Sequence, residues 1–230
     1  MSGMGYPQVK AGDAAPTAAA PVKAVLWDFG GVITTSPFDA FQAYEEANGL
    51  EPGFIRRRNS TNPHTNAWAR FERSEVTAVE FAALFEEEAR AAGGSVDAAA
   101  LLATLRGELR PSMVRAVERC RDHVKTGLLT NNFISARAEG AGEEADLYQQ
   151  VMDLFDVVVE SSKVGHRKPD IRFYEIACEL LAIDPTEAVF LDDLGINLKP
   201  ARQLGMRTIK VTDPSVALAE LQAHVGFDLN

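Results

Sequence analysis

Trp27-Asp28-Phe29-Gly30-Gly31 closes an apolar run that starts at Val22, and this stretch decides how the rest of the chain is interpreted. Polar clusters end three later segments in the same way: Leu129-Thr130-Asn131-Asn132, Gly165-His166-Arg167-Lys168-Pro169-Asp170 and Leu191-Asp192-Asp193-Leu194-Gly195. Short apolar runs are typical of buried strands. In an open α/β sheet the ligand crevice lies outside the carboxyl ends of the strands. We therefore expect a carboxylate, a hydroxyl, an ammonium and a carboxylate pair to meet at one mouth, a set suited to phosphoryl chemistry with a divalent cation.

The order of apolar and amphipathic stretches indicates the fold class. Strands are predicted at 22–27, 124–129, 157–159, 189–191 and 208–211. Helical patterns follow at 112–121, 148–155, 172–181, 198–204 and 215–225. Because strands that alternate with helices form parallel sheets covered on both faces, we predict a Rossmann-like α/β fold.

Residues 38–110 have a different character, with no clear strand and several amphipathic helical stretches. Thr77 and Glu80 form a capping-box pattern ahead of an apolar stripe, and Gly93-Gly94 is expected to end that helix. A further helix is expected from about Asp97. The sequence thus predicts a helical insert at 38–110 within a core made of 22–37 and 111–230. Residues 1–21, rich in Ala, Pro and Gly, are expected to be a disordered leader.

The four segments, in this order at strand ends, resemble the motifs of the haloacid dehalogenase-like (HAD) hydrolase superfamily. Lys168-Pro169-Asp170 and the run from Phe190 to Arg202 resemble one subgroup in particular. That subgroup contains the N-terminal phosphatase domain of soluble epoxide hydrolase and the related domain fused to some acyl-CoA dehydrogenases. The resemblance extends from about residue 22 to the last predicted helix. It implies that residues 38–110 are a small α-helical cap that covers the mouth and selects the substrate.

The resemblance also implies a nucleophile and a metal site. Asp28 would attack phosphorus and form an aspartyl-phosphate, which divides one difficult displacement into two easier ones. Mg²⁺ would be held by Asp28, the backbone carbonyl of Gly30 and Asp193, because this ion prefers oxygen ligands. Asp192 and Asn197 would support the site. Two adjacent carboxylates repel each other unless a cation is near, so the Asp192-Asp193 pair itself favours a metal.

A phosphate-binding set is implied in the same way. Thr130 and the Asn131-Asn132 turn would hold phosphoryl oxygens through a hydroxyl and backbone N–H groups. Lys168 would neutralise the phosphoryl group and restrain Asp28. Asp170 is expected to cap the next helix and to have no chemical role.

Gly30 departs from the family pattern, because family phosphatases usually carry a second Asp two residues after the nucleophile. That Asp is the general acid and base, a contribution worth about 10²–10⁴ in rate. Three interpretations stay open. The substrate has a good leaving group, as in an anomeric sugar, acyl or aryl phosphate; another residue, with His166, His64 and Asp39 as candidates, moves the proton; or turnover is poor and binding is the function.

Other chemistries of the superfamily fit the sequence less well. Phosphonate hydrolases use a cap lysine, and residues 38–110 contain no lysine. Haloacid dehalogenases work without a metal ion and lack the pair of adjacent aspartates that this chain has at Asp192 and Asp193. The sequence also has no Gly-x-Ser-x-Gly nucleophile elbow, so epoxide hydrolysis is not inferred. The sequence therefore predicts a Mg²⁺-dependent phosphomonoester hydrolase, with a non-catalytic binding or regulatory protein, or another HAD chemistry such as dehalogenation, as the alternative.

Composition and charge limit the partners. The net charge of −10 argues against nucleic acid or an anionic membrane, but not against a small phosphorylated substrate inside a cleft. No apolar run reaches the roughly 18 residues of a membrane span. Cys120 and Cys178 are expected to be reduced thiols, which together with the lack of a secretory segment predicts a cytoplasmic location. The expected oligomeric state is a monomer or a homodimer.

Arginines are frequent in the predicted cap, at Arg56-Arg57-Arg58, Arg70 and Arg73. They would either recognise a second anionic group on the substrate or pair in solvent with glutamates such as Glu86-Glu87-Glu88. The sequence does not decide between these two roles.

Overall fold

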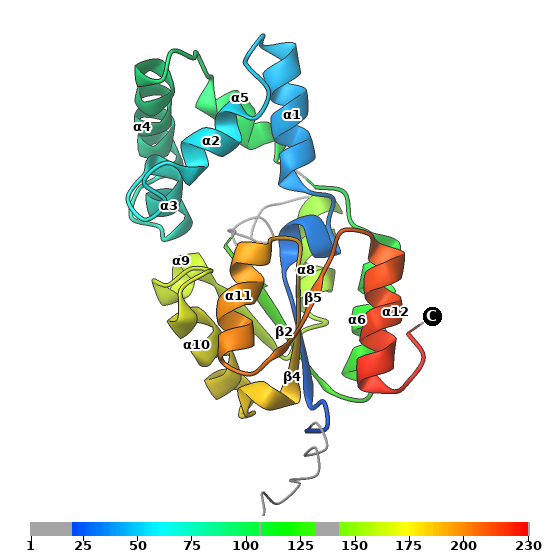
Figure 1. Cartoon of the computed structure of the whole chain (residues 1–230). Helices are drawn as coiled ribbons and strands as arrows, with labels where there is room; N and C mark the ends of the chain where they lie inside the picture. Colours follow the sequence, from blue (N-terminus) through cyan, green and yellow to red (C-terminus); the bar gives the residue numbers. More distant parts are fainter. Residues whose placement is uncertain (1–19, 106, 132–142, 230) are drawn as a thin grey trace, which may run out of the picture.

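The computed structural model describes residues 20–105, 107–131 and 143–229 (Figure 1). Five parallel strands form one sheet in the order β3-β2-β1-β4-β5. Their bounds are Ala24–Trp27 for β1, Lys125–Thr130 for β2, Val157–Glu160 for β3, Ala188–Asp192 for β4 and Arg207–Lys210 for β5. Each expected strand is confirmed, with ends that differ by one or two residues. The expected leader lies almost wholly outside the described residues.

Helices cover both faces of the sheet because the central strands are apolar on both sides. All four residues of β1 are buried. Val25 and Trp27 pack into one cluster with α6 (Pro111–Arg121), α8 (Glu143–Met152) and α12 (Pro214–Val225). Ala24 and Leu26 point the other way, toward α10 (Ile171–Leu181) and α11 (Gly195–Gln203). Alternate side chains of a strand lie on opposite faces, so this apolar run specifies a doubly covered, Rossmann-like α/β sheet.

One expected helix is displaced. The apolar pattern at 148–155 predicted a helix there, whereas α8 begins at Glu143 and ends at Met152. Phe155 is nevertheless buried in the core, from the connection that leads into β3. The apolar pattern therefore extends beyond the helix end because the connection itself is packed.

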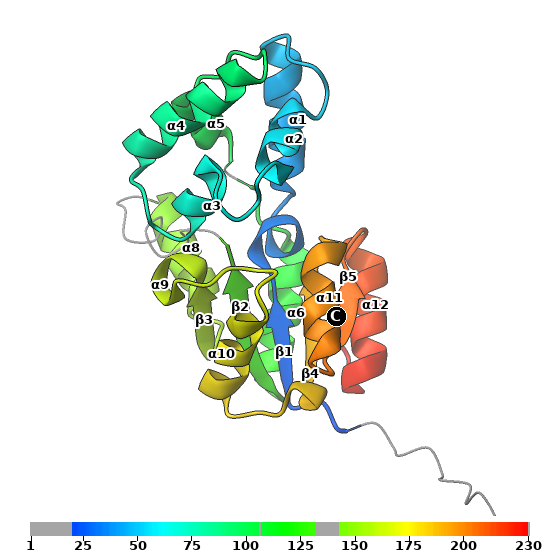
Figure 2. The same ribbon diagram turned by 60° about the vertical axis from the view of Figure 1, so that its left-hand side comes forward.

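The strand order positions the site. From the central strand β1 the chain proceeds to β2 and β3 on one side of the sheet, and later to β4 and β5 on the other (Figures 1 and 2). The carboxyl ends of β1 and β4 therefore flank the point at which the strand order reverses, which is where open α/β sheets form their ligand crevice.

The helices of residues 37–104 lie above that end of the sheet, as Figures 1 and 2 show, and we call these residues the cap. They are α1 (Pro37–Ala47), α2 (Phe54–Ser60), α3 (Ala67–Glu72), α4 (Ala78–Ala91) and α5 (Ala98–Thr104). The cap has a hydrophobic cluster of its own around Phe81 and Phe85. The predicted capping box is confirmed, because Thr77 and Glu80 each accept a backbone hydrogen bond from the other.

Shorter elements complete the core: η1 (Phe29–Ile33), α9 (Ser161–Val164) and η2 (Pro185–Glu187). Within the described ranges, every helix is too short or too polar to cross a membrane.

Candidate active site

The turn after β1 presents Asp28 at the centre of the sheet edge. Its backbone N–H donates to the Leu191 carbonyl at 2.9 Å, and its own Oδ1 accepts from Phe29 N at 2.6 Å. Gly31 follows with a φ of +80°, and a Cβ at this position would lie 2.3 Å from Oδ2 of Asp193. Position 31 therefore favours glycine for two reasons, the backbone conformation and the close approach of the Asp193 carboxylate.

Lys168 lies between two carboxylates. It is 1% exposed, and its Nζ lies 2.7 Å from Asp28 Oδ1 and 2.8 Å from Asp192 Oδ2. Burial alone would lower the pKa of Lys168, but the carboxylates of Asp192 and Asp28 raise it above its usual value. The side chain therefore remains an ammonium and fixes the orientation of Asp28.

Asp192 supports this arrangement from the end of β4. Its Oδ1 accepts hydrogen bonds from Leu194 N at 2.8 Å and from Asn197 Nδ2 at 3.0 Å, and its Oδ2 accepts from Lys168. Both oxygens are thus engaged by protein donors. Asn197 is itself 4% exposed, so the donor set is rigid.

Three carboxylates converge here, since oxygens of Asp28, Asp192 and Asp193 all lie within 4.8 Å of one another. Burial raises the pKa of Asp28 well above its usual value, against the attraction of Lys168. Burial, followed by repulsion from Asp192, raises the pKa of Asp193 to about 6. Facing one ammonium, the ionised cluster carries two uncompensated negative charges, which a divalent cation would balance. The hard oxygen donors of Asp28 and Asp193 suit such an ion.

The residues after β2 have a more mixed placement. Asn131 contacts both backbone polar groups of Lys168: its Nδ2 donates to the carbonyl at 3.0 Å, and its Oδ1 accepts from the N–H at 2.9 Å. This positioning role was not predicted, because no sequence signal links two residues so far apart. Thr130 is fully buried and is not part of the cavity lining, and Asn132 lies outside the described residues. Phosphate binding by this turn stays a prediction.

A cavity of about 760 Å³ opens between the core and the cap. Its core side includes Asp28, Lys168 and Asp193, and its cap side includes Trp68 and Arg56. The volume is in the range of about 300–1,000 Å³ typical of small-molecule sites. The predicted groups from β1, the Lys168 segment and β4 therefore meet at the mouth that the sequence indicated.

Comparison with known proteins identifies the family. A model described as haloacid dehalogenase-like hydrolase matches residues 22–205. The chain belongs to this family. The resemblance found in the four segments is confirmed.

Similar proteins include larger ones. The chain is 36% identical over 217 residues to acyl-CoA dehydrogenase family member 10 of Mus musculus, and 30% identical over 220 residues to bifunctional epoxide hydrolase 2 of Sus scrofa. Each alignment covers 90% of this chain but only 20% and 40% of the respective relative. The sesquiterpene phosphatase astK of Aspergillus oryzae is 26% identical over 205 residues, an alignment that covers 89% of this chain and 97% of that one.

A solved structure shares the fold. It is a complex of a mutant HAD family enzyme from Bacteroides thetaiotaomicron with magnesium and inorganic phosphate. The match has a TM-score of 0.57 at 18% identity and covers 82% of this chain and 93% of that chain. The α/β core of HAD hydrolases is therefore confirmed for this chain.

The position at which HAD phosphatases usually carry their second Asp is Gly30, which lines the cavity with a φ of −69° and a ψ of 126°. Of the three candidate replacements, His64 and His166 also line the cavity. The His166 ring is 2.7 Å from Asp170, which also caps α10 as expected. Asp39 is exposed in the first turn of α1 and is not part of the lining.

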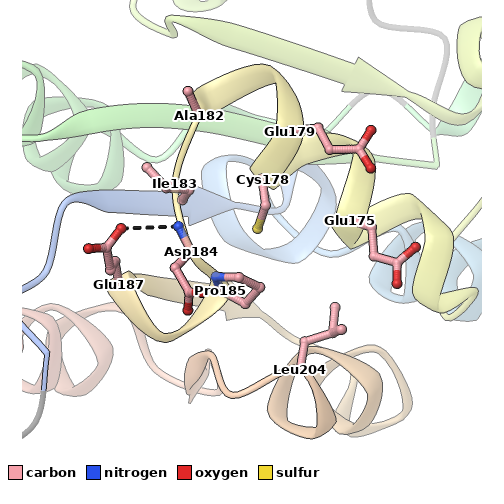
Figure 3. Close-up of a pocket in the computed structure, with 9 residues that line it drawn as sticks. All are labelled: Glu175, Cys178, Glu179, Ala182, Ile183, Asp184, Pro185, Glu187 and Leu204. Atoms are coloured by element: carbon pink, nitrogen blue, oxygen red, sulfur yellow. Dashed lines mark hydrogen bonds between the residues drawn. The ribbon is translucent and has the colours of Figure 1, made fainter.

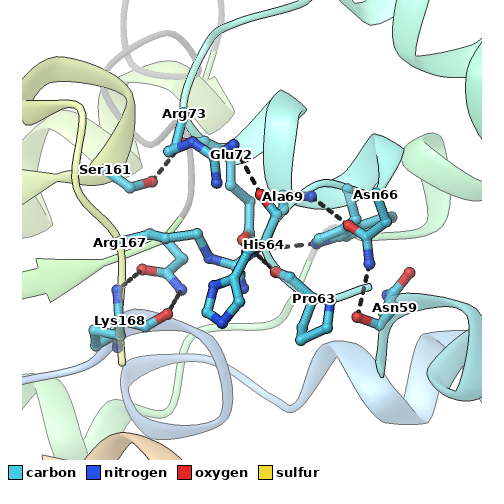
Figure 4. A network of polar contacts seen from close by, with 12 residues as sticks. Asn59, Pro63, His64, Asn66, Ala69, Glu72, Arg73, Ser161, Arg167 and Lys168 are labelled. Atoms are coloured by element: carbon cyan, nitrogen blue, oxygen red, sulfur yellow. Dashed lines mark hydrogen bonds and ion pairs between the residues drawn. The ribbon is translucent and has the colours of Figure 1, made fainter. Parts of the chain in front are cut away.

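The cap contacts the core through a group of polar residues that the sequence did not predict (Figure 4). Arg167 places Nη2 3.0 Å from Glu72 Oε2, and its Nη1 donates to the Pro63 carbonyl at 3.3 Å. Ser161 Oγ donates to the Glu72 carbonyl at 2.5 Å. We call these four residues the cap–core contact. Burial raises the pKa of Glu72, while Arg167 opposes that shift.

A second hollow, of about 550 Å³, lies at the opposite end of the sheet (Figure 3). Cys178 and Glu179 of α10 line it, together with Pro185, which precedes β4. Burial raises the pKa of Cys178 to about 11, so this thiol is not a reactive thiolate. The hollow is at the amino end of β4 and therefore takes no part in the chemistry at the carboxyl ends.

Proposed function

We propose that this protein is a Mg²⁺-dependent phosphatase that hydrolyses a small phosphomonoester through an aspartyl-phosphate on Asp28. One observation carries the proposal: a buried ammonium and three carboxylates meet at the floor of a cavity, with Lys168 2.7 Å from Asp28. Mg²⁺ would be held by Asp28, Asp193 and the Gly30 carbonyl. It would supply charge neutralisation for the phosphoryl oxygens.

The residues of the chain divide the reaction into two steps. An Asp28 oxygen bonds to phosphorus while the bond to the leaving oxygen breaks, and the leaving oxygen takes a proton from water. Water then attacks phosphorus, the P–O bond to Asp28 breaks, and inorganic phosphate leaves with the Asp28 carboxylate restored. The proton released by the attacking water neutralises the hydroxide that the first step leaves. Lys168 fixes Asp28 before attack and attracts the phosphoryl oxygens, so catalysis is mostly positioning and charge stabilisation.

The leaving group follows from Gly30. Without a carboxyl at this position, an alkoxide leaving group receives no proton from the usual donor, a loss of about 10²–10⁴ in rate. A phenolate, an acyl group or an anomeric sugar oxygen needs that proton less. The proposed substrates are therefore phosphomonoesters with good leaving groups. The name of the Aspergillus oryzae relative, a phosphatase of nearly the same length, supports the phosphoester class.

A release assay tests this proposal. Inorganic phosphate is measured with p-nitrophenyl phosphate, an anomeric sugar phosphate and a simple alkyl phosphate, each with Mg²⁺ and with EDTA. Asp28→Asn is expected to abolish turnover, whereas Asp39→Asn, a change at the exposed aspartate outside the cavity, should leave it intact.

Full activity in Asp28→Asn would refute the proposal. Stabilisation by phosphate esters without any phosphate release would instead support a binding protein that has kept the HAD fold. In that event Gly30→Asp, at a backbone conformation that any residue adopts, shows whether the missing carboxyl is the cause.

A further inference from the structure

Among the described residues that line the cavity, one arginine has no carboxylate partner. The lysines and arginines of the lining are Arg56, Arg73, Arg167 and Lys168. Lys168 is engaged by Asp28 and Asp192, Arg167 by Glu72 at 3.0 Å, and Arg73 by Glu75 at 2.6 Å. Arg56 forms no ion pair with any residue in the described ranges.

Arg56 is held by an aromatic ring. Its guanidinium carbon lies 4.8 Å from the ring centroid of Phe38. Phe38 meets Phe41 edge to face at 5.9 Å, and Phe41 meets Trp68 in the same way at 5.6 Å. All three rings also line the cavity. A guanidinium stacked on a ring keeps its N–H edges available for a planar anionic group. The cap side of the cavity is thus an apolar strip of three rings that ends at the Arg56 guanidinium.

Asn59 offers a hydrogen-bond acceptor beside Arg56. It lies three residues further along α2, and so on the same side of the helix, and it lines the same cavity. Its buried Oδ1 has no hydrogen-bond partner. Buried polar atoms are seldom left without a partner, and an amide oxygen only accepts, so a hydroxyl or N–H group of a bound molecule would complete it, while an anionic group is left to Arg56.

The alternative role for the cap arginines does not account for Arg56. Glu86 and Glu88, which were expected to pair with arginines in solvent, instead accept hydrogen bonds from backbone N–H groups of the cap. Arg57, the neighbour of Arg56, donates to the Pro52 carbonyl at 2.7 Å and is not part of the lining. The difference between these two adjacent arginines singles out Arg56.

We propose that Arg56 forms a second anion subsite in the cap. The protein then selects phosphomonoesters whose organic part is apolar or aromatic and ends in a second anionic group, such as a carboxylate or another phosphate. The phosphoryl group lies against Asp28 and Lys168, the apolar part lies along Phe38, Phe41 and Trp68, and the distal anion reaches Arg56. This inference rests on the proposed phosphatase function.

Matched pairs of aryl phosphates test the subsite. The first pair is 4-carboxyphenyl phosphate and 4-carbamoylphenyl phosphate, and the second pair carries the same groups at the 4′ position of biphenyl-4-yl phosphate. Biphenyl-4,4′-diyl bisphosphate distinguishes a preference for phosphate from one for carboxylate. The carbamoyl group withdraws electrons more strongly than the carboxylate, so leaving-group strength works against the expected preference.

The expected result is a kcat/KM ratio of carboxylate to carboxamide of about 10 to 100 for at least one length, as for a charge-assisted hydrogen bond. The ratio should fall to near one in Arg56→Gln, be partly kept in Arg56→Lys and be unchanged in the matched control Arg57→Gln. Turnover of the carboxamides should be the same in the wild type and in Arg57→Gln, and in the two Arg56 variants it should fall less than turnover of the carboxylates. A ratio near one in the wild type at both lengths, or an unchanged ratio in Arg56→Gln, overturns the subsite.

Failure of the phosphatase function is distinguishable from failure of the subsite. If none of these esters is hydrolysed, the proposed function fails, and the same pairs are titrated calorimetrically into wild type and Arg56→Gln. Tighter binding of the carboxylates that is lost in Arg56→Gln would still support the subsite. Equal binding of carboxylate and carboxamide would refute it.

Discussion

Lys168 in the core and Arg56 in the cap line the same cavity, but their surroundings differ. Lys168 is 1% exposed and lies within 2.8 Å of two carboxylates, whereas Arg56 is exposed and is stacked on Phe38. Groups that must hold a reacting carboxylate in place need fixed partners. A group that recognises a variable part of a substrate needs an open donor. The core side of the cavity therefore suits chemistry, and the cap side suits selection.

The largest expected effect comes from removing the cation of the core. Lys168→Met leaves Asp28 and Asp192 buried without their shared partner, which should cost about 3–5 kcal/mol of unfolding free energy in the absence of divalent cations. Turnover should fall by about 10²–10³. Urea unfolding and phosphate release measure the two effects, and Lys199→Met, at an exposed lysine of α11, is the control. A Lys168→Met protein with wild-type stability would mean that the core site is not the preorganised one.

Alanine substitutions at Gly31 and Gly93 separate the effect of backbone strain from the effect of site geometry. Gly31 and Gly93 have φ values of +80° and +83°, but a Cβ on Gly31 would lie 2.3 Å from Asp193 Oδ2, whereas one on Gly93 would meet nothing within 4 Å. Alanine at either position should cost about 1–2 kcal/mol of unfolding free energy. Only Gly31→Ala should also lower kcat/KM, by about 10²-fold, because Asp193 must move. Equal activity in the two variants would contradict the close approach of Asp193.

The sequence predicted the core far better than the cap for a physical reason. A strand such as β1 is recognisable in the sequence as an apolar run, because both of its faces are buried. Asp28 and Asp192 can be predicted to lie at strand ends because each stands at the end of such a run. Arg56, Arg167 and Asn131 receive their roles from partners distant in the chain. Their packing is decided by tertiary contacts that no local pattern records. The displaced end of α8 has the same origin, since Phe155 is buried from the connection that follows the helix.

The cap–core contact links the two regions, and Arg167→Ala tests whether it positions the cap. Arg167 precedes Lys168 and pairs with Glu72, and the two side chains are 22% and 12% exposed. Losing a partly exposed pair should lower kcat/KM about fivefold, roughly 1 kcal/mol. Hydrogen exchange should quicken in α3. Arg172→Ala, which removes ion pairs confined to α10, is the matched control. Unchanged exchange in Arg167→Ala would mean that the cap is held by its apolar contacts alone.

The smallest effect on activity is expected from Thr77→Ala in the cap. Thr77 caps α4 through Glu80 N, and Glu80 in turn accepts from Thr77 N at 2.8 Å, but neither residue lines the cavity. Losing this cap should cost about 1 kcal/mol of unfolding free energy. The kcat/KM should stay at the wild-type value, because α4 contributes to the hydrophobic cluster of the cap, whereas the cap helices that line the cavity are α1, α2 and α3. Urea unfolding and phosphate release decide this, with the exposed Ser95→Ala as control. A fall in kcat/KM that matches the loss of stability would show that activity depends on the fold of the whole cap. The contrast between a fixed core side and an open cap side of the cavity would then apply only to individual side chains such as Lys168 and Arg56.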